Sequence, residues 1–136
     1  MEKTKRQLKF YTSLWAMMPH DQTGVVLPYD QICEMVAEAG YDGLAIDLGA
    51  GDVAQANAVR PHLERFGLTP LIVAFPKTIN ALEDTLLMAK DFGAPFVDVI
   101  GQVMPLSVDG MIPVIRKWIE MADQLDMPIQ FETHRN

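Results

Sequence analysis

Apolar positions along the chain fall into two alternating kinds of segment. Short runs rich in aliphatic, aromatic and β-branched residues predict strands, and longer segments with apolar residues at helical spacing predict helices. The runs that predict strands are residues 8–17, 41–49, 68–76, 94–104 and 127–133. The segments that predict helices are residues 27–40, 52–67, 78–93 and 107–126.

Start signals and apolar faces mark the predicted helices. Asp52 and Thr78 are suitable N-terminal caps for the second and third helices. Pro61 lies inside the second helix and predicts a kink or a break near Arg60. The predicted buried faces are Ile32, Met35, Val36 and Ala39, then Leu82, Leu86 and Ala89, then Val114, Trp118, Ala122 and Leu125.

The four helix-to-strand junctions resemble one another, which indicates a repeated structural unit. Gly40, Gly67 and Gly93 stand where a helix ends with a left-handed residue, and Asp126 takes that place in the fourth junction. The junctions recur roughly every thirty residues, the size of one strand-plus-helix unit. Strands that alternate with helices in this way predict a parallel sheet covered by helices.

Two α/β architectures fit this pattern. The first is a partial (β/α)8 TIM barrel of about four βα units plus a fifth parallel strand, in which residues 1–136 form a single domain. The second is a complete flavodoxin-like module with a doubly wound sheet. The module would carry a phosphoacceptor aspartate after the third strand, where the chain has Pro76. We therefore expect the barrel, with strand order 1-2-3-4-5 rather than 2-1-3-4-5.

Charge and composition narrow the possible partners. The net charge of −7 argues against a nucleic-acid or anionic-membrane surface and favours a cation or a neutral small molecule. No apolar run is long enough to span a bilayer. The chain has a single cysteine, Cys33, which fits a reducing compartment. We expect Cys33 to be a small, buried hydrophobic residue on a helix. The basic and then apolar start resembles a signal peptide, but Tyr11, Thr12 and Ser13 interrupt it, so we expect a cytoplasmic protein.

The most reactive pair of residues lies at the end of the fifth predicted strand. Parallel α/β proteins gather their functional residues at the carboxyl ends of the strands. Glu132 and His134 are two residues apart, so on a strand they point to the same side. A carboxylate beside an imidazole suits proton transfer or a divalent cation such as Mn²⁺, Mg²⁺ or Zn²⁺. The alternative is a solvated polar loop.

Four further residues near predicted strand ends are candidates for substrate binding. Trp15 is a candidate pocket wall, His20 a candidate contact after the first strand, and Arg135 a candidate partner for substrate oxygens. Asp47 either faces the substrate or caps the turn at Gly49–Gly51. His20 could equally be an ordinary loop histidine.

Several stretches resemble the sugar phosphate isomerase/epimerase family, which has the xylose-isomerase-like TIM barrel. They are "FYTSLWAM", "EMVAEAGYDGLAIDLGAGD", "AKDFGAPFVDVIGQ" and above all "IQFETHRN". The resemblance spans the whole chain but only the amino-terminal five-eighths of a family member. It implies that Glu132, at the position of a strand-five glutamate, is a metal ligand and that His134 lies beside the metal. The other ligands of such enzymes usually come from strands six, seven and eight.

The resemblance implies a fragment of a metal-dependent sugar or sugar phosphate isomerase/epimerase. A metal would polarise a ketose carbonyl while a carboxylate removes the proton from the adjacent carbon. Glu132 and His134 would be the catalytic residues, and the expected partner is a small sugar or ketose, with homo-oligomerisation left open. Because the later strands are absent, we expect this chain to be inactive alone. An abasic-site nuclease on the same barrel would need a basic face, which the acidic balance disfavours.

Overall fold

Five parallel strands form one sheet in the order β1-β2-β3-β4-β5. The computed structural model describes residues 7–19, 24–49 and 51–133. The strands are β1 (Tyr11–Ser13), β2 (Gly43–Asp47), β3 (Thr69–Ala74), β4 (Val97–Val99) and β5 (Ile129–Phe131). The helices are η1 (Trp15–Met17), a short 3-10 turn, and α1 (Tyr29–Glu38), α2 (Val53–Arg65), α3 (Ala81–Phe92) and α4 (Val108–Gln124).

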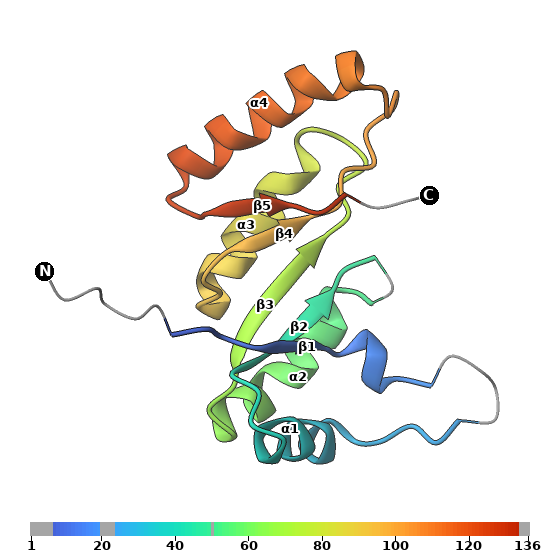
Figure 1. Ribbon diagram of the computed structural model, residues 1–136, viewed down its shortest axis with the longest axis vertical. Coiled ribbons are helices and arrows are strands. Elements are labelled where there is room, and N and C mark those ends of the chain that lie inside the picture. The colour runs from blue at the N-terminus through green and yellow to red at the C-terminus, as the bar shows by residue number, and fades with distance from the viewer. Residues whose placement is uncertain (1–6, 20–23, 50, 134–136) are drawn as a thin grey trace, which may run out of the picture.

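The sheet is part of a TIM barrel. Each strand pairs in parallel with the next strand of the sequence, and a helix lies between each successive pair. Figure 1 shows the strands fanning from β1 to β5, with α1 and α2 near one end of the sheet and α4 beyond β5. A flavodoxin-like module would place β1 between β2 and β3. The observed order excludes that alternative and confirms the predicted one.

The two faces of the sheet have different side chains. On the outer face, aliphatic residues of β2, β3 and β4 pack into the same core as the helices, and their side chains are fully buried. These residues are Leu44, Ile46, Ile72, Val97 and Val99. Successive residues of a strand point to opposite sides, so the residues between them face the inside of the barrel. The inner face therefore carries Ala45, Asp47, Leu71, Val73 and Asp98.

The helices supply the other half of the core, largely as predicted. The predicted faces of α3 and α4 are buried, with Leu125 only partly so. In α1 the prediction is partly wrong, because Met35 and Ala39 are exposed while Cys33 is buried beside Ile32 and Val36. The buried stripe therefore includes Cys33, and burial raises the pKa of its thiol to about 11, with a smaller contribution from Asp30.

Of the kink or break predicted near Arg60, the break is wrong, and the kink stays a prediction. Helix α2 continues from Val53 to Arg65 with Pro61 inside it. Pro61 itself is exposed, whereas Val59 and Leu63 on either side of it are fully buried against the core. Packing of these two side chains holds both parts of the helix in place despite the missing backbone donor.

Helix ends confirm the repeated junction. Gly40, Gly67 and Gly93 have φ values of 85°, 65° and 74°, and Asp126 has a φ of 49°. Asp126 is the one non-glycine residue with positive φ in the part of the chain that the structure describes. Asp52 caps α2, because its carboxylate accepts a hydrogen bond of 2.8 Å from the backbone N–H of Gln55. The repeated turns set the thirty-residue spacing that brings successive strands into register.

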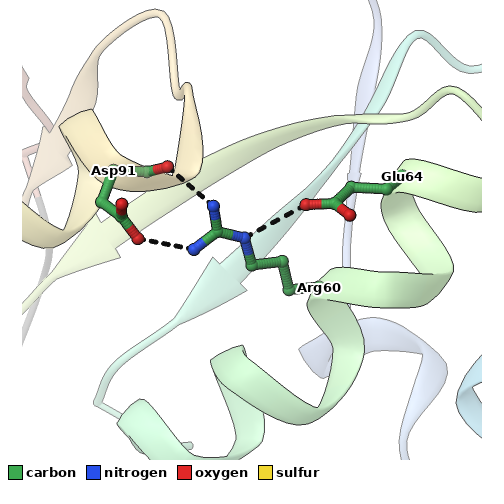
Figure 2. Close-up of polar contacts among 3 residues, drawn as sticks. All are labelled: Arg60, Glu64 and Asp91. Carbon is green, nitrogen blue, oxygen red and sulfur yellow. Dashed lines mark hydrogen bonds and ion pairs between the residues drawn. The ribbon is translucent and has the colours of Figure 1, made fainter.

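On the outer surface, Arg60 ties α2 to α3 (Figure 2). Its guanidinium donates to the carboxylate and the backbone carbonyl of Asp91 and, within α2, to Glu64. The same group lies 4.6 Å from the centre of the Phe92 ring. These contacts lie at the helical surface, remote in the fold from the inner face of the sheet, and they are structural.

Candidate functional site

A cleft of about 530 Å³ lies at the carboxyl ends of β1 to β4. Each of these strands or the turn after it contributes to the wall, as expected for a parallel α/β sheet. Seven residues line the cleft: Trp15, Asp47, Leu48, Gly49, Phe75, Lys77 and Gln102. Trp15 and Asp47, two of the predicted substrate-binding residues, therefore lie in one cavity.

Asp47 accepts a hydrogen bond from the turn after β2 and also lines the cleft, and its contact with a substrate stays a prediction. It is the last residue of β2, and its Oδ1 accepts a hydrogen bond of 2.7 Å from the backbone N–H of Gly49. The turn lies close to the Phe75 ring, because a Cβ added at Gly49 would come within 2.6 Å of that ring. Asp47 thus shapes the turn after β2 and also contributes a carboxylate to the cleft wall.

Trp15 forms another part of the wall. It begins η1, directly after β1, and half of its surface, 51%, is exposed. An exposed indole at a cleft is a large, flat apolar surface on which the CH face of a sugar can rest. Trp15 lines the cleft, as expected of a pocket wall, and its role in substrate binding stays a prediction.

Lys77 and Gln102 complete the polar part of the cleft and were not among the predicted site residues. Both follow strand ends directly, which was the available signal. Backbone pairing between β3 and β4 continues beyond the strands, because the N–H of Gln102 donates to the carbonyl of Pro76 at 3.1 Å. This extension places Gln102 in the cleft wall, to which Lys77 also contributes.

Glu132 lies one residue beyond β5. Its backbone N–H donates to the carbonyl of Val99 at 3.1 Å, so the pairing of β4 with β5 continues past Phe131. By alternation along the strand, Glu132 shares the inner face with Gln130 and Asp98. Its carboxylate is exposed. His20, His134 and Arg135, the other predicted site residues, lie outside the described residues.

A carboxylate on β4 was missed from the sequence. Asp98 is only 9% exposed, and within the described ranges its Oδ1 has no hydrogen-bond partner. In the sequence it sits in "FVDVI", where the surrounding aliphatic residues indicate a strand buried on both faces. In register it lies between Val73 of β3 and Gln130 of β5, on the inner face.

In the part of the chain that the structure describes, Glu132 is a suitable donor for the predicted metal, but a full set of ligands is not found. An exposed carboxylate at a strand end is a suitable oxygen ligand for Mg²⁺ or Mn²⁺. Among residues 7–19, 24–49 and 51–133, however, no group of three or more His, Cys, Asp or Glu side chains is arranged to hold a metal ion. The donor type therefore fits, and the number of ligands falls short of a complete site.

Comparison with known proteins supports the fold. No protein-family model matches the chain, and no curated protein matches it either. The solved structure of 4-hydroxy-tetrahydrodipicolinate synthase from Methylacidiphilum fumariolicum SolV is similar, with a TM-score of 0.64 and 14% identity. That similarity covers 92% of this chain and 44% of the synthase.

A second similar structure is 3-dehydroquinate dehydratase from Geobacillus kaustophilus HTA426. The TM-score is 0.61, the identity is 17%, and the match covers 94% of this chain and 51% of the dehydratase. The chain thus spans about half the length of both neighbours. At these identities the likeness establishes a partial TIM barrel. Neither neighbour carries the name of a sugar isomerase, so the family resemblance remains a prediction.

One further observation concerns membranes. Within the described part of the chain, no helix has both the length and the apolar character needed to cross a bilayer.

Proposed function

We propose that this chain is the amino-terminal part of a divalent-metal-dependent sugar or sugar phosphate isomerase/epimerase. The observation that carries the proposal is the position of Glu132, an exposed carboxylate on the inner face at the carboxyl end of β5. This is the end of a TIM barrel at which catalytic residues gather. The sequence "IQFETHRN" adds the family resemblance.

In this proposal Glu132 is a metal ligand, and the metal is Mn²⁺, Mg²⁺ or Zn²⁺. When bound, such an ion polarises a carbonyl oxygen of the substrate. One ligand does not make a tight site, because metal sites of this kind need several donors in fixed geometry. The remaining ligands are expected from residues outside the described chain, with His134 beside the metal or on the substrate.

The cleft supplies the binding groups for a small sugar or ketose. Trp15 offers an apolar surface for one face of the sugar. Asp47 can accept hydrogen bonds from hydroxyl groups, and the Gln102 amide can accept or donate them. Lys77 adds a positive charge that suits a developing oxyanion or a phosphate oxygen. Glu132 or a neighbouring carboxylate would remove the proton next to the carbonyl. Arg135 is proposed to orient substrate oxygens.

The 136-residue chain is expected to lack isomerase activity on its own. The physical reason is that the chemistry needs about three metal ligands, and no group of three or more His, Cys, Asp or Glu side chains among the described residues could hold a metal ion. Ketose turnover by the purified chain, abolished by a chelator and restored by Mn²⁺, would contradict this expectation.

The test of the proposal is a metal titration of the full protein that carries this segment. Glu132→Gln keeps the side-chain shape but removes a negative charge, so Mn²⁺ affinity should fall by roughly ten- to hundredfold or more, the loss found even for indirect contacts. The matched control is Glu34→Gln, which changes an exposed carboxylate on α1. It should leave affinity unchanged.

Two further readouts sharpen the result. Raising the pH should not restore activity to Glu132→Gln, because the defect is a lost charge rather than a wrong protonation state. His134→Gln should reduce turnover more than metal affinity. Equal Mn²⁺ affinity in the unmodified protein, Glu132→Gln and His134→Gln would mean that this strand end is only a polar surface.

A further inference from the structure

The inner face of the sheet contains a buried carboxylate that no role described above uses. Asp98 is nine-tenths buried, and its Oδ1 has no hydrogen-bond partner within the described residues. Its backbone neighbours Val97 and Val99 point into the outer core, so by alternation the Asp98 side chain points to the inside of the barrel.

Register places Asp98 in the same row of the sheet as Asp47. Asp47, Val73, Asp98 and Gln130 form one row across β2, β3, β4 and β5. Asp47 lines the cleft, and Asp98 lies two strands away in the same row, about 10 Å across the sheet. Glu132 is two residues beyond Gln130, so it lies about 7 Å nearer the carboxyl end.

Burial makes an unpartnered carboxylate costly. A buried polar oxygen without a hydrogen bond loses its interaction with water and gains nothing in return. Such groups are rare in folded proteins, and an exception calls for a partner or a function. On the outer face the in-register neighbours of Val97 and Val99 are all apolar, so the partner has to come from the inner face.

We propose that Asp98 is a substrate-binding residue whose Oδ1 accepts a hydrogen bond from a hydroxyl group of a neutral polyhydroxy ligand. The assignment rests on the proposed function, because it places this hydroxyl below the metal-bound end of a sugar. Asp47 and the Gln130 amide, in the same row, would contact neighbouring hydroxyls.

The charge of the row also sets the ligand class. Asp47 and Asp98 are both carboxylates, and the row contains no basic residue among its four members. An anionic group placed here would meet like charge in a partly desolvated site, which disfavours it. The row therefore selects the uncharged, hydroxyl-bearing end of a substrate. A phosphate group would lie elsewhere, for example near Lys77 in the cleft.

Sugar binding by the 136-residue chain in the presence of a chelator tests this assignment. The probe is D-fructose, titrated into isotopically labelled protein and followed by the amide signals of residues 97–102. Asp98→Asn and Asp98→Ser should weaken binding about tenfold or more, the ratio expected when a hydrogen bond to a charged group is lost. Asp84→Asn, an exposed carboxylate on α3, is the matched control and should bind like the unmodified chain.

A second measurement uses no ligand. If Oδ1 has no partner in the free protein, Asp98→Asn removes a buried charge and should raise the urea midpoint of unfolding, while Asp84→Asn should not. A lower midpoint for Asp98→Asn, equal fructose affinity in all variants, or no saturable fructose binding by the unmodified chain would each overturn the assignment. Since the chelator excludes metal, these outcomes do not depend on whether Glu132 proves to be a metal ligand.

Discussion

The outer and inner faces of the same sheet contrast strongly. On the outer face, Leu44, Ile46 and Ile72 have no exposed surface and pack against the helices. On the inner face, Asp47 of β2 and Asp98 of β4 are both in register with Val73 of β3. Because successive residues of a strand point to opposite faces, a core residue and an inner-face residue are neighbours in the sequence. The outer face stabilises the fold, and in the proposed function the inner face, towards the carboxyl ends, supplies polar groups for binding.

The largest expected difference between the two faces is at the two tryptophans. Trp118 is fully buried under the helices, its Nε1 donates to the carbonyl of Ile79 at 3.0 Å, and its ring stacks on Phe131. Trp118→Ala should lower the free energy of unfolding by about 3–5 kcal/mol, because it leaves a cavity and an unpaired carbonyl. Urea denaturation followed by circular dichroism measures this loss.

Trp15→Ala is the matched control. The Trp15 side chain is half exposed at the cleft, so its removal should change the free energy of unfolding by less than about 1 kcal/mol. It should instead weaken sugar binding. Equal destabilisation by the two substitutions would show that the cleft wall is part of the core.

A medium effect is expected at the amino end of the inner face, where the sheet is closely packed. A Cβ added at Gly43 would come within 2.6 Å of the Tyr11 ring and 2.1 Å of the Thr69 carbonyl oxygen. Gly43→Ala should therefore cost about 1–3 kcal/mol, as overpacking does. Gly40→Ala meets no atom within 4 Å and is strained only by its φ of 85°, so it should cost about 1 kcal/mol. A loss at Gly43 no larger than at Gly40 would show that β1 can shift freely.

The smallest effect is expected from Cys33, and it appears only at alkaline pH. Burial raises the pKa of its thiol from 9.0 to about 11. Because the folded protein holds this proton more tightly, the associated stability is complete below pH 9 and is lost as the pH rises through about 11. Cys33→Ala should lack this component of the alkaline loss. A thiol reagent at neutral pH should label Cys33 far faster in urea than in the native protein, and equal rates would contradict its burial.

Much of the fold could be predicted because local chemistry decides it. The four junctions at Gly40, Gly67, Gly93 and Asp126 have the predicted left-handed backbone, and the strand order follows the predicted barrel. Pro61 shows the limit of local rules. Its missing donor predicts a break, but burial of Val59 and Leu63 keeps α2 continuous. Tertiary packing outweighed the local preference.

The site was predictable only in part. Trp15 and Asp47 could be found because they follow strand ends, where side chains of parallel α/β proteins converge. Asp98 could not, since its position in an aliphatic run gives no sign that one carboxylate faces inwards. Register across β2, β3, β4 and β5 is needed to place it beside Gln130 and level with Asp47. That register depends on contacts far apart in the sequence.

The most direct test of the central claim maps Mn²⁺ onto the whole surface of the chain. Paramagnetic Mn²⁺ broadens the amide signals nearest to it, so even weak binding can be located in a labelled sample. If the inner face at the carboxyl end of β5 is the metal-binding face, the signals of residues 99–102 and 131–133 should broaden first. Glu132→Gln should abolish this preference. Broadening that begins instead at exposed carboxylates of the outer helices, such as Glu64 on α2 or Asp84 on α3, would contradict the account.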